Sequence, residues 1–119
     1  MTGITNKTVN KKGICFKDSF KTFLNDLDKC SLIISNGNDL NVLKENCKFS
    51  NTKFKFCNFN FYNCRYYLAK RGGVTYKEAN SSELHRIFNF NSKKKYKAHN
   101  ALDDCHLILD SLILNDFFK

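Results

Sequence analysis

The stretch KAHNALDDC at residues 97–105 opens a C-terminal segment in which apolar residues recur at helical spacing. It places His99 five residues before Asp104, with the small Ala101 between them. A carboxylate can hold a divalent ion while an imidazole takes a proton from water, so this pair suits metal-assisted hydrolysis. The pattern predicts a helix from about residue 99 to residue 116, with an inward face formed by Ala101, Cys105, Ile108 and Leu112.

Upstream of this stretch, helical and strand-like patterns alternate. Residues 1–14 are polar and predict a connector, and apolar spacing then predicts an amphipathic helix over about residues 15–29. The apolar run at residues 31–35 lies between turn signals and predicts a buried strand. Asn38 or Asp39 is expected to cap the next helix. The inward side chains of that helix are expected to be Leu40, Leu43 and Cys47.

The middle of the chain predicts one more strand and two helices. Residues 53–57 alternate lysine with apolar side chains, which predicts a strand with one solvated face. Residues 60–70 predict a helix, ended by a glycine cap at residues 71–73. Ser81 or Ser82 is expected to cap a short helix. Its apolar side chains are Leu84, Ile87 and Phe88.

The order of these elements is helix, strand, helix, strand and then helices, which is typical of an α/β fold with a parallel sheet. Two strands form an inadequate sheet on their own. We therefore expect further strands from another segment or chain, and we expect an isolated chain with an incomplete sheet to self-associate.

The chain carries 20 Lys and Arg against 11 Asp and Glu, a formal net charge of +9. Such a balance favours polyanions such as nucleic acid, although solubility alone is an equal explanation. Residues 89–95 predict a polar, basic loop that concentrates positive charge beside His99. The lysines expected to contact a nucleic-acid backbone are Lys93, Lys94, Lys95 and Lys97.

At 119 residues with 42% hydrophobic content, the chain suits one folded domain. It has neither an apolar signal-peptide core nor a run long enough to cross a membrane, so the expected location is cytoplasmic. The six cysteines include no Cys-x-x-Cys pair and are expected to be reduced. A small protein stapled by disulfides or a metal, unrelated to hydrolysis, is the alternative that these cysteines leave open.

Several segments together resemble one enzyme family. The pattern His99-x-Ala101-x-x-Asp104 resembles the third motif of DnaQ-like 3′–5′ exonucleases of the DEDDh type, which have a ribonuclease-H-like fold. Residues 1–5 (MTGIT) resemble the Thr-Gly-Ile segment that follows the third strand in these enzymes. Residues 33–47 resemble their second motif, in which an aspartate follows a strand and opens a helix.

The resemblance departs from the family pattern at two points. The first motif, Asp-x-Glu on the first strand, is absent, and Asp26-Leu27-Asp28 lies in the wrong place to replace it. Residues 1–119 therefore resemble the C-terminal two-thirds of the domain, truncated at the N-terminus, with two strands and about five helices. The second-motif aspartate aligns with Asp39 when matched on the downstream helix, and with Leu40 when matched on the upstream turn.

The resemblance implies two Mg²⁺ or Mn²⁺ ions at a site that cleaves DNA or RNA from the 3′ end. His99 would be the general base, Asp104 a direct metal ligand and Asp39 a ligand of the second ion. The strands missing from the chain would come from an upstream segment or a partner chain. The alternative is a remnant that binds nucleic acid or a partner protein without cleaving.

Overall fold

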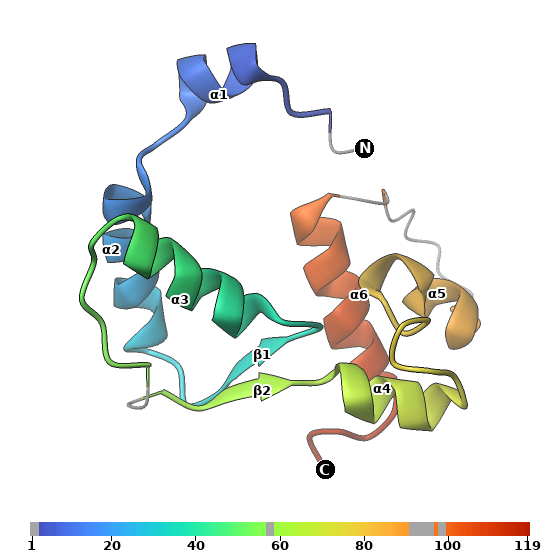
Figure 1. Ribbon diagram of the computed structural model, residues 1–119. Helices are drawn as coiled ribbons and strands as arrows, with labels where there is room; N and C mark the ends of the chain where they lie inside the picture. The colour runs from blue at the N-terminus through green and yellow to red at the C-terminus, as the bar shows by residue number, and fades with distance from the viewer. Residues whose placement is uncertain (1–2, 57–58, 91–96, 98–99) are drawn as a thin grey trace. The chain divides into compact units, whose positions relative to one another are not determined.

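The computed structural model describes residues 3–56, 59–90, 97 and 100–119 (Figure 1). This part of the chain is mixed α/β and mostly helical, with one small sheet of two parallel strands. Contacts divide it into two compact units, residues 3–62 and residues 63–119, here named the N-terminal and C-terminal units. Each unit is described by itself.

The N-terminal unit begins with helix α1, Asn6–Lys12, where the sequence predicted a connector. The prediction was wrong because local capping forms a helix without an apolar face. The Thr5 hydroxyl accepts a hydrogen bond from the Thr8 backbone N–H at 3.2 Å. Lys11 and Lys12 lie in the last turn, where positive charge favours the helix dipole. Every residue of α1 is exposed.

Helix α2, Phe16–Leu27, confirms the predicted amphipathic helix and buries Phe20 and Leu27. Phe20 lies in a cluster of aromatic rings. Its ring centroid is 5.2 Å from that of Phe54, and the Phe54 centroid is 4.7 Å from that of Phe56 in an edge-to-face contact. These rings tie the segment after the third helix to α2.

Strands β1, Ile33–Ser35, and β2, Phe61–Asn63, form the sheet and run in the same direction (Figure 1). The Ile33 N–H donates to the Asn60 carbonyl at 2.8 Å, which sets their register. The position of the first strand was predicted correctly, but its residues are half-buried where a buried strand was expected. The second was predicted wrongly: described residues 53–56 have no strand structure, and Phe54 and Phe56 pack in the aromatic cluster, which Phe61 of β2 also joins.

Helix α3, Asp39–Phe49, connects the two strands and confirms the predicted helix and its capping residue. Asn38 occupies the cap position. Its side-chain oxygen accepts a hydrogen bond from the side-chain amide of Asn41 at 2.6 Å. Cys47 is buried, as predicted, and the other two predicted inward residues are half-buried.

The C-terminal unit begins with helix α4, Arg65–Gly72, which buries Leu68 and Ala69. The helix begins later than residue 60 because residues 61–63 belong to β2. It ends as predicted on Gly73, whose φ of 63° lies in the left-handed region that favours glycine.

A 3₁₀ turn η2, Ser81–Glu83, leads into the short helix α5, Leu84–Ile87. The predicted serine cap was wrong, because Asn80 occupies the cap position of η2 and both candidate serines lie inside the 3₁₀ turn. The short helix itself was predicted, and Leu84 is fully buried.

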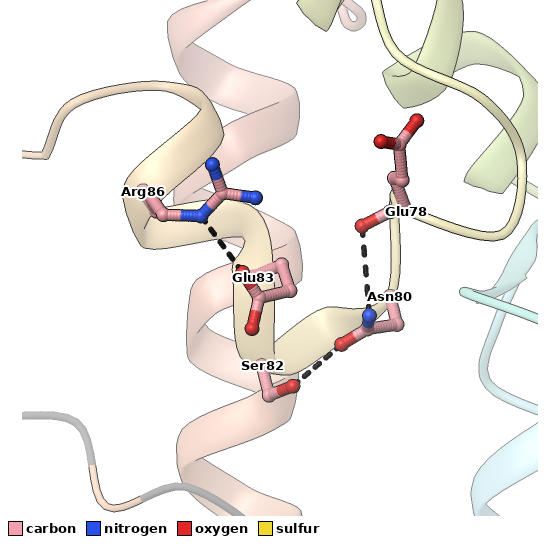
Figure 2. A network of polar contacts seen from close by, with 5 residues as sticks. All are labelled: Glu78, Asn80, Ser82, Glu83 and Arg86. Atoms are coloured by element: carbon pink, nitrogen blue, oxygen red, sulfur yellow. Dashed lines mark hydrogen bonds and ion pairs between the residues drawn. The ribbon is translucent and has the colours of Figure 1, made fainter.

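Polar contacts fix this connection between α4 and α5 (Figure 2). The Asn80 amide donates to the Glu78 carbonyl, and its oxygen accepts from the Ser82 hydroxyl. The Arg86 Nε donates to Glu83 Oε2 at 2.8 Å, one turn away. The polar connection therefore has a defined backbone path.

Helix α6, Ala101–Leu114, packs against η2 and α5. It buries Leu107, Ser111 and Leu112, whereas the predicted inward residues Ala101 and Cys105 are exposed. Leu112 is buried as predicted and Ile108 is half-buried, so the predicted face was wrong only at Ala101 and Cys105. Apolar residues occur on several sides of this helix, so its periodicity alone does not determine its rotation. Among the described residues, no helix is long and apolar enough to cross a membrane.

The C-terminal end of α6 is bound to α4. The Tyr67 hydroxyl and the Arg71 guanidinium, one turn apart on α4, both donate to the carbonyl of Asn115, which ends α6. The Tyr67 ring also packs edge-on against Phe117, with centroids 5.0 Å apart. These contacts satisfy a carbonyl that the helix leaves without an internal partner.

Candidate functional site

The N-terminal end of α6 has a well-defined cap. The Asn100 side-chain oxygen accepts from the N–H groups of Leu102 and Asp103 at 3.1 and 3.2 Å. The Asp103 carboxylate accepts from the Lys97 backbone N–H at 2.9 Å. Asp103 therefore stabilises the entry into the helix, and its neighbour Asp104 is left for other chemistry.

Asp104 lies on the buried side of α6, three residues before Leu107 and seven before Ser111. Its Oδ1 atom is buried and has no hydrogen-bond partner among the described residues. Burying an acceptor without a partner costs about 1–3 kcal/mol, and more when it is charged. The Asp104 carboxylate thus faces inward, and a hydrogen-bond donor or a cation would complement it.

Of the predicted base and phosphate-binding lysines, the structure describes Lys97. Lys97 is exposed, as a residue that contacts a phosphate backbone must be. The remaining predicted base and lysines lie outside the described residues; they are His99, Lys93, Lys94 and Lys95.

Asp39 is the first residue of α3 and is exposed, whereas Leu40 is half-buried. Negative charge at this end of a helix interacts favourably with the helix dipole. Two residues align with the aspartate of the second motif. Asp39 offers an exposed carboxylate, whereas Leu40 has none. Asp39 belongs to the N-terminal unit and Asp104 to the C-terminal unit.

Among the residues that the structure describes, no group of three or more His, Cys, Asp or Glu side chains gathers that could hold a metal ion. A buried carboxylate oxygen on Asp104 is one ligand of the right chemistry, but it does not make a complete Mg²⁺ or Mn²⁺ site. No disulfide bond involves the cysteines that the structure describes, which are Cys15, Cys30, Cys47, Cys64 and Cys105.

A second candidate site, which the sequence pattern does not predict, lies in the N-terminal unit. A cavity of about 1070 Å³ is lined by one side of α3 and by the segment that follows it. We name it the basic groove, after the lysines among its lining residues Lys44, Lys48, Lys53, Phe54, Lys55 and Phe56. The sequence signal for this site is the alternation of lysine and phenylalanine at residues 53–56, a pattern that also predicts a strand.

The chain was compared with protein-family models, curated proteins and solved structures. No family model, no curated protein and no solved structure matches the chain. The case for a function therefore depends on the residues and on their geometry.

Proposed function

We propose that this chain is the C-terminal two-thirds of a DEDDh-type 3′–5′ exonuclease domain with a ribonuclease-H-like fold. Its substrate would be the 3′ end of DNA or RNA. The observation that carries the proposal is the buried oxygen of Asp104, which has no partner among the described residues. It occurs at the position that the motif His99-x-Ala101-x-x-Asp104 assigns to a metal ligand.

The order of the elements supports the same proposal. Strand β1 is followed by α3, which opens with Asp39, and α6 opens with the third motif. A parallel pairing of β1 with β2 across α3 is typical of the βαβ units that form such folds. Two strands leave the sheet incomplete, so the proposal requires further strands from an upstream segment or a partner chain.

In the complete site, the residues of this chain would act on water and on the nucleic-acid backbone. His99 would take the proton of the attacking water, because an imidazole has an ordinary pKa of about 6.5. Lys97 and the lysines before it would bind phosphates without sequence preference. The Mg²⁺ or Mn²⁺ ions that the resemblance implies require a larger set of ligands than the described residues bring together.

A second candidate function is a remnant that binds nucleic acid, or a partner protein, without cleaving. The basic balance of the chain, 20 Lys and Arg against 11 Asp and Glu, supports binding of a polyanion by such a remnant. The net charge of +9 is compatible with both functions.

The test is the degradation of single-stranded DNA and RNA labelled at the 5′ end, in Mg²⁺ or Mn²⁺. We expect negligible hydrolysis by the chain alone, and hydrolysis when strands that carry Asp-x-Glu are added in trans. His99→Ala and Asp104→Asn should each abolish that activity, and EDTA should abolish it in every sample. Robust degradation by the chain alone, lost in His99→Ala, would contradict the need for further strands. Binding without cleavage, unaffected by His99→Ala, would favour the remnant.

A further inference from the structure

The basic groove combines two kinds of side chain within one unit. Lys44 and Lys48 are one turn apart on α3, so they project from the same side of the helix. Lys53 and Lys55 alternate with two phenylalanines in the segment after α3. All of these residues line the same cavity of about 1070 Å³.

The groove has an excess of positive charge. Glu45 also lines it, and its carboxylate accepts from the Lys48 ammonium at 2.7 Å. Lys44, Lys53 and Lys55 have no ion pair among the residues that the structure describes, and all three are exposed. The complementary ligand is therefore an anion with several charges.

The two phenylalanines of the groove are half-buried and held in place by the aromatic cluster. Phe54 and Phe56 contact each other edge-to-face, and Phe20, which is buried, contacts Phe54 in the same way. Aromatic rings beside spread lysines are typical of surfaces that bind single-stranded nucleic acid, because bases stack on the rings while phosphates meet the lysines.

The size and composition of the groove favour a strand over a mononucleotide. Its volume slightly exceeds the range of about 300–1,000 Å³ for small-molecule sites. No glycine is among the described residues that line it, so these residues offer no glycine-rich backbone loop to cradle the clustered phosphates of a nucleotide. Its lysines are instead spread over a helix and an extended segment, which suits a chain with one phosphate per nucleotide.

We propose that the basic groove binds single-stranded DNA or RNA, with Lys44, Lys53 and Lys55 on the phosphates and bases against Phe54 and Phe56. This site belongs to the N-terminal unit and does not contain the hydrolytic motif. Binding of a single strand at the basic groove requires neither His99 nor a divalent ion, so this proposal can be tested apart from the proposed nuclease function.

The experiment is a fluorescence-anisotropy titration of the whole chain with labelled oligothymidine and oligouridine of about 12 nucleotides, in EDTA. Each lysine that neutralises a phosphate contributes about −0.7 to the slope of log affinity against log salt for a single strand. Lys44→Gln with Lys53→Gln should therefore reduce the slope by about 1.4. If affinities converge near 1 M salt, the variant should bind about 25-fold more weakly near 0.1 M salt.

The matched control is Lys17→Gln with Lys21→Gln on α2, which removes the same charge from exposed positions that do not line the groove. This control should leave the slope nearly unchanged. Equal losses in both double variants would overturn the proposal, because binding would then reflect general positive charge. Circular dichroism of each variant checks that the exposed glutamines leave the fold intact.

Stacking is tested with an abasic strand of the same length and charge. Each stacked base is worth about 1–3 kcal/mol, so the abasic strand should bind at least about fivefold more weakly. Equal affinity for the abasic strand, or for a polyglutamate of equal charge, would overturn the proposal. Tighter binding of oligothymidine would indicate that the natural ligand is DNA, and tighter binding of oligouridine would indicate RNA. Retention of this binding in His99→Ala would separate the groove from the hydrolytic motif.

Discussion

The buried oxygen of Asp104 predicts that its removal will stabilise the chain. Asp104→Ala deletes an acceptor that has no partner among the described residues, at a helix position where alanine is favourable. Residues that bind a ligand commonly lower the stability of the unliganded protein, because their polar groups are unpaired when the ligand is absent. The neighbouring Asp103 is the matched control, since its carboxylate holds the Lys97 N–H.

The magnitude follows from three contributions to the free energy of unfolding. Removing the unpaired acceptor contributes about 1–3 kcal/mol. Losing a negative charge near the helix N-terminus costs about 0.3–1 kcal/mol, and alanine recovers up to about 0.7 kcal/mol in helix propensity. The net expectation for Asp104→Ala is a gain of about 1–2 kcal/mol. With about 2.1 cal/mol/K of unfolding entropy per residue over 119 residues, this raises the melting temperature by about 4–8 °C.

The assay is thermal unfolding followed by circular dichroism, near neutral pH and in EDTA. Asp103→Ala should lower the melting temperature, because it removes a hydrogen bond to a charged group and a favourable interaction with the helix dipole. The two neighbouring substitutions should therefore have opposite signs. A loss of stability in Asp104→Ala as large as that in Asp103→Ala would refute the reasoning, since the carboxylate would then have a partner within the fold.

Two further predictions concern the C-terminal unit. Gly72→Ala should destabilise it by about 1–3 kcal/mol in chemical denaturation, because the new Cβ would lie 2.4 Å from Ile87 Cγ2, whereas alanine at exposed Lys70 in the same helix should be nearly neutral. The pKa of Glu78 is held below its ordinary value of 4.5, chiefly by hydrogen bonds from Thr75. Its stabilising contribution is therefore present at neutral pH and lost as the pH falls through the folded-state pKa, so Glu78→Gln should lower the melting temperature near pH 7 but not at a pH below the folded-state pKa. A difference between Glu78→Gln and wild type that persists at the lower pH would contradict this account.

Much of the local structure could be predicted from the sequence, because local signals encode it. The spacing of the phenylalanines placed α2, and the asparagine before Asp39 placed the start of α3. The glycine pair after α4 placed its end, because Gly73 adopts a positive φ. Helix α1 was missed because capping by Thr5, without an apolar face, forms it.

The candidate sites were less predictable, since they depend on contacts distant in sequence. The motif around Asp104 was visible as a spacing, but its buried and unpaired oxygen was not. The basic groove was missed because residues 53–56 alternate as a strand does, although their rings pack beside Phe20 and their lysines line a cavity.

The sequence by itself determined the charge, the helical segments, one strand and the motif that ends in Asp104, because each depends on residues within a few positions of one another. Only the tertiary structure decided that residues 61–63 pair with β1, since strand pairing depends on contacts between segments distant in sequence. It also decided the rotation of α6, because a helix that is apolar on several sides is oriented by its neighbours η2 and α5 and not by its own pattern alone. That rotation turns Asp104 inward and Cys105 outward.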